Sequence, residues 1–182
     1  MKLPRSVSKG CTLVELMIVV GILAIVSGIM IPSFSTYTRN QTLKQAQENL
    51  KSDLRSAQNK ALTGTGSDTL INGNPVLYWA VLYSDAAGSN TTYSFYLTAS
   101  NSCSVNATLQ QTVTLPASIS IVSSGSHCLL FSLDDGSVFE RNISTGLTVP
   151  IPDTTINLRH SSDTTTTKSI SINKAGLIYS SN

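Results

Sequence analysis

The chain has 182 residues, of which 41% are hydrophobic and only 12% are charged. This length allows one globular domain with an additional segment and leaves little room for two domains of ordinary size. The net charge of +2 is unevenly distributed: residues 1–10 hold three basic residues and no acid, whereas residues 64–182 hold four basic residues against seven acids, a net −3. Domains that bind nucleic acid backbones usually carry the opposite sign, so this charge argues against a nucleic-acid partner.

The N-terminus combines a short basic leader, residues 1–10, with a strongly apolar run over residues 13–31. As a helix this run would be roughly 28 Å long. A segment of that length can cross the hydrocarbon core of a bilayer. The simplest interpretation is therefore an ordinary signal peptide or signal anchor.

Three details argue against an ordinary signal peptide. No small-x-small cleavage site follows the apolar run, and Cys11 precedes the run, whereas a lipoprotein cysteine would follow it. In addition, Glu15 lies inside the apolar segment. A carboxylate near a bilayer core costs on the order of 2.5–3.5 kcal/mol on insertion scales, so Glu15 requires a partner.

The sequence Gly10-Cys11-Thr12-Leu13-Val14-Glu15-Leu16 resembles the prepilin cleavage and methylation motif of type IV pilins and type II secretion pseudopilins. The resemblance implies that a prepilin peptidase cuts between Gly10 and Cys11 and methylates the new amine. It also implies that Glu15 pairs with the N-terminal amine of a neighbouring subunit during assembly. Cys11 departs from the family, in which Phe or Met is usual at this position. Thr12 and Glu15 also fit a capping box at a helix start.

This resemblance implies a structural role for the chain. The expected function is that of a minor pilin or pseudopilin, held by one span in the bacterial inner membrane and then assembled into an extracellular pilus or a periplasmic pseudopilus. The implied partners are the prepilin peptidase, other pilin subunits of a helical filament, the inner-membrane assembly machinery and, before assembly, membrane lipid. A major pilin and a DNA-binding minor pilin of a competence pilus remain as alternatives.

A helical pattern continues beyond Pro32, which we expect to kink the helix because proline removes a backbone donor. Apolar residues recur at steps of three and four, which predicts one buried helix face up to Gly64 and Gly66. That face comprises Leu43, Ala46, Leu50, Leu54, Ala57 and Ala61, and the opposite face holds Arg39, Lys44, Lys51, Arg55 and Lys60. Residues 54–61 are similar to the LRSAR-x-x-A segment of FimT/GspH-type minor pilins, with Gln58 in place of the arginine.

After Gly66, short β-prone runs alternate with turn signals, which predicts an antiparallel sheet. The expected strands are residues 76–83, 92–98, 118–122, 128–133, 137–141, 155–159, 169–172 and 177–179. Residues 134–136 and 173–176 read as hairpin turns, and the polar run 164–167 reads as a solvated loop. The closing stretch 170–178 resembles the last hairpin of the FimT/GspH-type proteins.

The expected fold class is therefore α+β: a type IV pilin-like fold with a long, kinked N-terminal helix packed on an antiparallel β-sheet domain. Its segments are a cleaved leader (1–10), a transmembrane or filament-core helix (11–32), an amphipathic helix half (33–63) and a globular β-rich domain (64–182).

Two cysteines of this domain, Cys103 and Cys128, are expected to form a disulfide, because the domain is expected outside the cytoplasm. Two free buried thiols are the alternative. His127 and His160 read as strand or loop-edge residues. We find no metal-ligand spacing, phosphate-binding glycine loop or nucleophile motif, and therefore expect no cofactor, no metal and no enzymatic activity.

Overall fold

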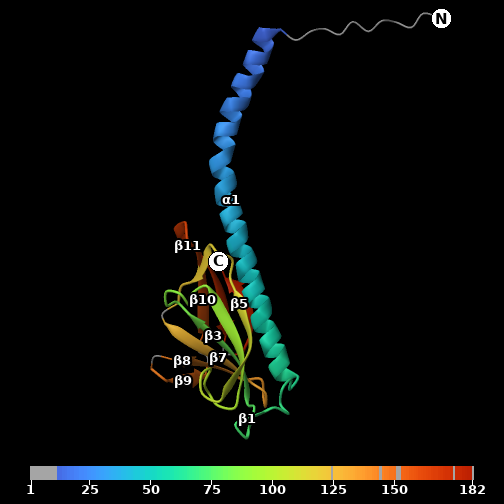
Figure 1. Ribbon diagram of the computed structural model, residues 1–182, viewed down its shortest axis with the longest axis vertical. Coiled ribbons are helices and arrows are strands. Elements are labelled where there is room, and N and C mark those ends of the chain that lie inside the picture. Colours follow the sequence, from blue (N-terminus) through green and yellow to red (C-terminus); the bar gives the residue numbers. More distant parts are fainter. Residues whose placement is uncertain (1–11, 124, 144, 151–152, 174, 182) are drawn as a thin grey trace, which may run out of the picture. The chain divides into compact units, whose positions relative to one another are not determined.

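The structure is a computed structural model that describes residues 12–123, 125–143, 145–150, 153–173 and 175–181, without the side chains of residues 29–33. One helix, α1 (Leu13–Leu62), precedes a series of strands (Figure 1). The strands are β1 (Leu70–Ile71), β2 (Asn74–Pro75), β3 (Tyr78–Ser84), β4 (Thr92–Thr98), β5 (Ala107–Thr114), β6 (Ile119–Ile121), β7 (Ser126–Ser132), β8 (Val138–Asn142), β9 (Thr148–Pro150), β10 (Asp153–His160), β11 (Asp163–Asn173) and β12 (Ile178–Ser181).

The chain divides into two compact units, residues 1–40 and 41–182, so that α1 contributes to both. In the first unit, residues 13–28 form one continuous exposed helical stretch. The helix assignment continues through Pro32. The predicted kink at Pro32 stays a prediction, because the side chains around this residue lie outside the described part of the chain.

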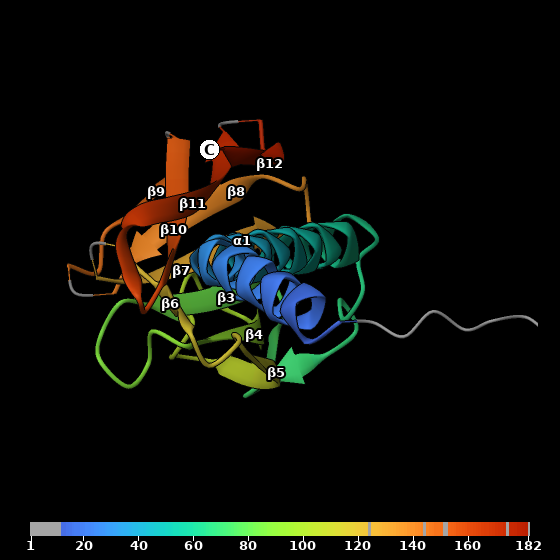
Figure 2. The ribbon, with the colours of Figure 1, turned by 90° about the horizontal axis from the view of Figure 1, so that it is seen from above.

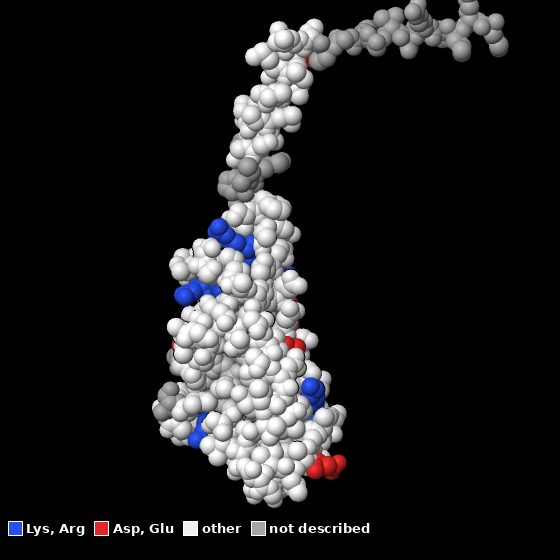
Figure 3. Space-filling view, in the orientation of Figure 1, with Lys and Arg blue, Asp and Glu red and all other residues white. Residues whose placement is uncertain are grey.

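The second unit is built on two antiparallel sheets. The larger sheet has the order β5-β4-β3-β7-β8-β9, and the smaller has the order β12-β11-β10-β6. Strands β1 and β2 form a separate short hairpin. The charged side chains on the face of this unit in Figure 3 are few and scattered, as expected from a composition rich in serine, threonine and asparagine.

A single apolar core joins α1 to both sheets. The predicted helix face is buried throughout, with Leu43, Ala46, Leu50, Leu54, Ala57 and Ala61 each no more than 1% exposed. It packs with Phe131 and Val81 of the larger sheet and with Ile156 and Ile170 of the smaller sheet. Figure 2 shows strands β3 to β5 and strands β10 to β12 on opposite sides of this half of the helix. Each large apolar side chain buried in this way, such as Leu50, contributes about 1.5–3 kcal/mol.

The α+β class, the long N-terminal helix and the antiparallel pairing are confirmed, and each expected strand coincides with an observed one. The turn at residues 134–136 is also confirmed: the Gly136 amide donates to the Ser132 carbonyl, 3.2 Å away, and Gly136 has a φ of 71°. Glycine is favoured here by the backbone angle, whereas an added side chain would meet only the end of the exposed Leu62 side chain, which can move aside.

The sequence-based expectations differ from the structure in one loop and in four strands: β5 and the short strands β1, β2 and β9 were not expected. Residues 164–167 do not form a loop but belong to β11, where Thr167 pairs with Arg159. The run is polar because it lies in an extended hairpin arm that is mostly exposed. Strand β5 was not anticipated, because it is an edge strand exposed on both faces and so lacks the alternation that marks a half-buried strand.

Candidate functional site

The first turn of α1 carries the residues that were expected to function in assembly. Thr12 precedes the helix, and its Oγ1 accepts a hydrogen bond of 3.2 Å from the Glu15 amide. This is the N-cap half of the expected capping box, and it fixes the start of the helix at Leu13. The Glu15 side chain is on the exposed surface of this turn. Gly10 and Cys11 lie outside the described residues, so cleavage between them stays a prediction, as does the pairing role of Glu15.

The helical surface that follows is apolar on all sides. Exposed fractions of its large apolar side chains run from 74% at Leu13 to 42% at Val26. A contiguous apolar surface of this kind marks a site that is covered by another molecule. Among the residues that the structure describes, no helix is both long enough and apolar enough to cross a membrane.

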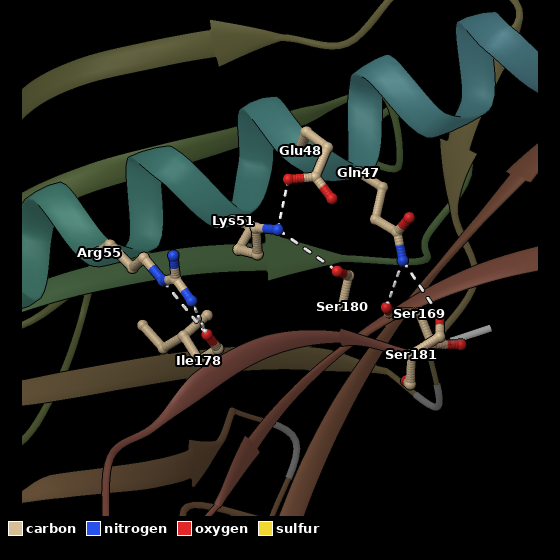
Figure 4. A network of polar contacts seen from close by, with 8 residues as sticks. All are labelled: Gln47, Glu48, Lys51, Arg55, Ser169, Ile178, Ser180 and Ser181. Atoms are coloured by element: carbon tan, nitrogen blue, oxygen red, sulfur yellow. Dashed lines mark hydrogen bonds and ion pairs between the residues drawn. The ribbon is translucent and has the colours of Figure 1, made fainter.

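Polar side chains attach the second half of α1 to the β11–β12 part of the smaller sheet (Figure 4). Gln47 Nε2 donates to the carbonyls of Ser169 (2.6 Å) and Ser181 (3.1 Å). Arg55 donates to the Ile178 carbonyl through Nη2 (2.6 Å) and Nε (3.2 Å). Gln58 Nε2 donates to the Gly176 carbonyl at 2.8 Å.

These contacts explain why the second half of α1 carries long polar side chains on the side that faces the smaller sheet. Strand β12 is the edge of its sheet, and an edge strand presents backbone groups that lack a strand partner. The donor stripe of α1 covers this edge and its approach: Gln47 reaches both β11 and β12, Arg55 reaches β12, and Gln58 reaches the residue Gly176 that precedes β12. Lys51 extends the stripe by contacting Glu48 and the Ser180 hydroxyl. Two of the donors, Arg55 and Gln58, belong to the 54–61 segment singled out in the sequence. The third, Gln47, was missed, although a glutamine inside the apolar face was a signal for it.

A second polar link joins α1 to the larger sheet. The Tyr93 hydroxyl of β4 donates to Asp53 Oδ2 over 2.6 Å. Burial raises the pKa of Tyr93 far above its usual range, and the hydrogen bond and negative charge of Asp53 add to that effect. The hydroxyl therefore stays protonated and remains a donor to the helix at all physiological pH values.

Glu140 of β8 joins the two sheets. Its Oε1 accepts from the Tyr83 hydroxyl at 3.2 Å, and its Oε2 accepts from Thr154 Oγ1 of β10 at 2.5 Å. His127 Nδ1 lies 2.8 Å from Oε1, and the imidazole stacks on the Tyr83 ring. Burial, followed by the charge of Glu140, raises the pKa of Tyr83 well above normal.

This cluster borders an open cavity of about 500 Å³ that also reaches Asp153 and Asn157. The sequence did not reveal the cluster, because its members come from four different strands, β3, β7, β8 and β10. His127 was expected at a strand or loop edge and does lie in a strand, but its side chain is largely buried. The cluster stabilises the seam between the sheets through hydrogen bonds to a charged group, which are stronger than neutral ones.

The expected disulfide between Cys103 and Cys128 is present. Both cysteines are buried, and they form a small second cluster with Ala80 and Leu130 on the outer face of the larger sheet. The bond holds the loop between β4 and β5 against β7. Arg141 adds a hydrogen bond of 3.1 Å to the Asn101 carbonyl in the same loop.

Among the described residues, no group of three or more histidine, cysteine, aspartate or glutamate side chains could hold a metal ion. His160 is a buried residue whose Nδ1 accepts the Ser162 amide at 3.1 Å. This contact closes the turn between β10 and β11, so His160 has a structural role.

Comparison with known proteins places the N-terminal segment in a described family. Residues 5–31 match the prokaryotic N-terminal methylation motif. No curated protein sequence matches the chain significantly. Two crystal forms of the type IV minor pilin FimU of Pseudomonas aeruginosa strain PAO1 are similar in structure. The P21 form has a TM-score of 0.49 and 17% identity over 80% of this chain and 92% of FimU. The P65 form has a TM-score of 0.44 and 15% identity over 77% and 93%.

The family match extends over the second half of the leader, the expected cleavage position and the apolar run, and it confirms the motif that residues 10–16 indicated. The N-terminal segment of this chain therefore carries the prokaryotic N-terminal methylation motif, with Gly10, Cys11 and Glu15 inside the matched residues.

Proposed function

We propose that this protein is a structural subunit, of the minor pilin or pseudopilin type, that enters a helical filament of a type IV pilus or a type II secretion system through α1. The observation that supports this function most directly is the methylation motif at residues 5–31. The motif leads into a helix whose first half is apolar and exposed. Its second half is committed to the core of a β-rich unit.

The exposed half of the helix defines what the partners must supply. Burial stabilises each of its large apolar side chains by about 1.5–3 kcal/mol relative to exposure to water. The segment therefore requires an apolar partner that covers it. Inner-membrane lipid provides that cover before assembly, and the corresponding helices of other subunits provide it inside a filament. Because lipid already excludes water, the transfer from membrane to filament releases little hydrophobic free energy. Assembly therefore depends on inner-membrane machinery and on specific polar contacts.

Glu15 is the polar contact that we assign to this step. Cleavage after Gly10 by a prepilin peptidase would create a positively charged amine at Cys11, four residues before the Glu15 carboxylate. Pairing of Glu15 with the amine of a neighbouring subunit would neutralise both charges in a medium of low dielectric constant. Removal of one partner of a buried ion pair leaves the other uncompensated, at a cost of about 3–5 kcal/mol. The same pairing would set the axial register between subunits.

The experiment compares three full-length chains in cells: the native sequence, Glu15→Ala and Glu48→Ala. Glu48 is a matched control because it is another glutamate on the same helix and it pairs with Lys51 within its own subunit. We expect the native chain and Glu48→Ala in sheared filaments. We expect Glu15→Ala to be processed but retained in the inner membrane. Normal amounts of Glu15→Ala in filaments would refute the pairing role and leave Glu15 as a helix-capping residue only.

A further inference from the structure

An open groove of about 580 Å³ runs along the second half of α1, beside its contacts with β12. Its charged lining consists of Lys51, Arg55 and Lys60 against the single carboxylate of Glu48, and the remaining lining is serine, asparagine and threonine. Since Glu48 is paired with Lys51, the positive charges of Arg55 and Lys60 dominate the groove. The groove is therefore basic, whereas the β-rich part of the same unit, residues 64–182, carries a net negative charge.

The cations of the groove are held in place by the fold. Arg55 is fixed by its two hydrogen bonds to the Ile178 carbonyl (Figure 4), and these use Nε and Nη2 of the guanidinium. Lys60 Nζ lies 4.8 Å from the centre of the Trp79 ring, a cation–π contact. Trp79 is itself fixed, because its Nε1 donates to the Thr65 carbonyl at 2.7 Å. Side chains that are already ordered lose less entropy when they bind an anion.

The same chain carries an exposed acidic turn. The turn between β7 and β8 presents Asp134 and Asp135 side by side, both exposed. Asp135 accepts hydrogen bonds from the amide (3.0 Å) and hydroxyl (2.6 Å) of Ser137, which lower its pKa and keep it charged. Among the described residues of one chain, the observed salt bridges do not join this turn to the groove.

We propose that the acidic β7–β8 turn of one copy of this chain docks into the basic groove of α1 on a second copy. We place the contact head to tail, with the turn of each copy in the groove of the next. Such a heterologous contact, when repeated, generates a ring or an open helix. This inference rests on the proposed function, because a helical filament requires a contact of that kind. It adds a contact between the globular units to the contacts made by the apolar half of α1.

Carbodiimide crosslinking of full-length protein tests the contact. Chains labelled with ¹⁴N and chains labelled with ¹⁵N are mixed and reconstituted at high surface density in lipid vesicles, and lysine–carboxylate crosslinks are then identified by mass spectrometry. A crosslink between Lys51 and Glu48 is the internal control, since this pair lies within one chain and must give same-isotope peptides. We expect mixed-isotope peptides that join Lys51 or Lys60 to Asp134 or Asp135.

Variants separate the specific contact from general charge effects. Asp134→Lys should lower the yield of mixed-isotope crosslinks at Asp135 about threefold to fivefold, the effect expected of an exposed ion pair. Asp85→Lys makes the same change in charge beyond the opposite end of β3 and should leave the yield unchanged. Combining Asp134→Lys with Lys60→Glu should restore the association, which would be detected as mixed-isotope crosslinks between positions 134 and 60.

Two results overturn the inference: same-isotope crosslinks alone, or mixed-isotope crosslinks that join other parts of the chain. Either can occur while the native chain still enters filaments and Glu15→Ala still fails to do so. The groove and the N-terminal assembly function are therefore judged by separate measurements.

Discussion

Gln47 offers the sharpest test of how α1 is fastened to the β-rich unit. Its side chain is only 3% exposed, and its single amide group donates to carbonyls of both β11 and β12. Gln47→Leu keeps the approximate volume but removes the donor, leaving the Ser169 and Ser181 carbonyls against an apolar group. A neutral hydrogen bond contributes about 0.5–1.5 kcal/mol, and a buried polar group left without a partner costs about 1–3 kcal/mol. We expect the free energy of unfolding to fall by about 2–3 kcal/mol in total.

The assay is urea unfolding of a fragment containing residues 34–182, followed by the fluorescence of Trp79, the single tryptophan of the chain. Trp79 is buried, its Nε1 donates to Thr65 just after the end of α1, and Lys60 of α1 lies over its ring, so its emission reports on docking of the helix. Gln45→Leu makes the same chemical change at an exposed position of the helix and should alter stability by less than about 0.5 kcal/mol. If Gln47→Leu is no more destabilising than Gln45→Leu, the fastening role of Gln47 is wrong.

Three further changes test other parts of the structure. Replacing Cys103 and Cys128 together by serine should lower the free energy of unfolding by about 3–4 kcal/mol, and reductant should destabilise the native chain but not this variant. Thr154→Val should cost about 1–3 kcal/mol by removing a hydrogen bond to the Glu140 carboxylate, and an unchanged urea midpoint would contradict the role of that contact. Hydrogen bonds from the threonines that follow Asp163 lower its pKa, so its stabilising effect is present above the ordinary value of 3.8 and is lost as the pH falls through the folded-state pKa. Asp163→Asn should therefore flatten the loss of stability below about pH 4, and an acid profile identical to that of the native chain would refute this explanation.

Local sequence patterns revealed most of the elements. The apolar face of α1 was predictable because helix periodicity depends only on neighbours three and four residues apart. The hairpin at residues 134–136 was predictable because its aspartates and glycine meet the needs of a tight turn. The expected strands include some with one buried face, such as Thr92–Thr98, in which apolar residues alternate with polar ones, and some apolar runs buried on both faces, such as Ser126–Ser132.

Features that depend on distant partners were not predictable in this way. Strand β5 is defined by its pairing with β4, since nothing on its own exposed faces distinguishes it from a loop. Gln47 and Glu140 each make their contacts with strands that lie far away in the sequence. A sequence pattern shows that such residues are polar, but it does not show which carbonyl or hydroxyl completes their hydrogen bonds. The disulfide is an exception, because only two cysteines were available in the β-rich part.

The central claim is that this chain is a processed subunit of a helical filament, and its most direct test is the identity of the N-terminus in assembled material. Intact-mass and peptide mass spectrometry of the protein from sheared filaments should show a chain that begins at Cys11 and carries a methylated amine. A bulky substitution at Gly10 should abolish that species and keep the chain out of filaments. Assembled protein that still begins at Met1 would contradict the account.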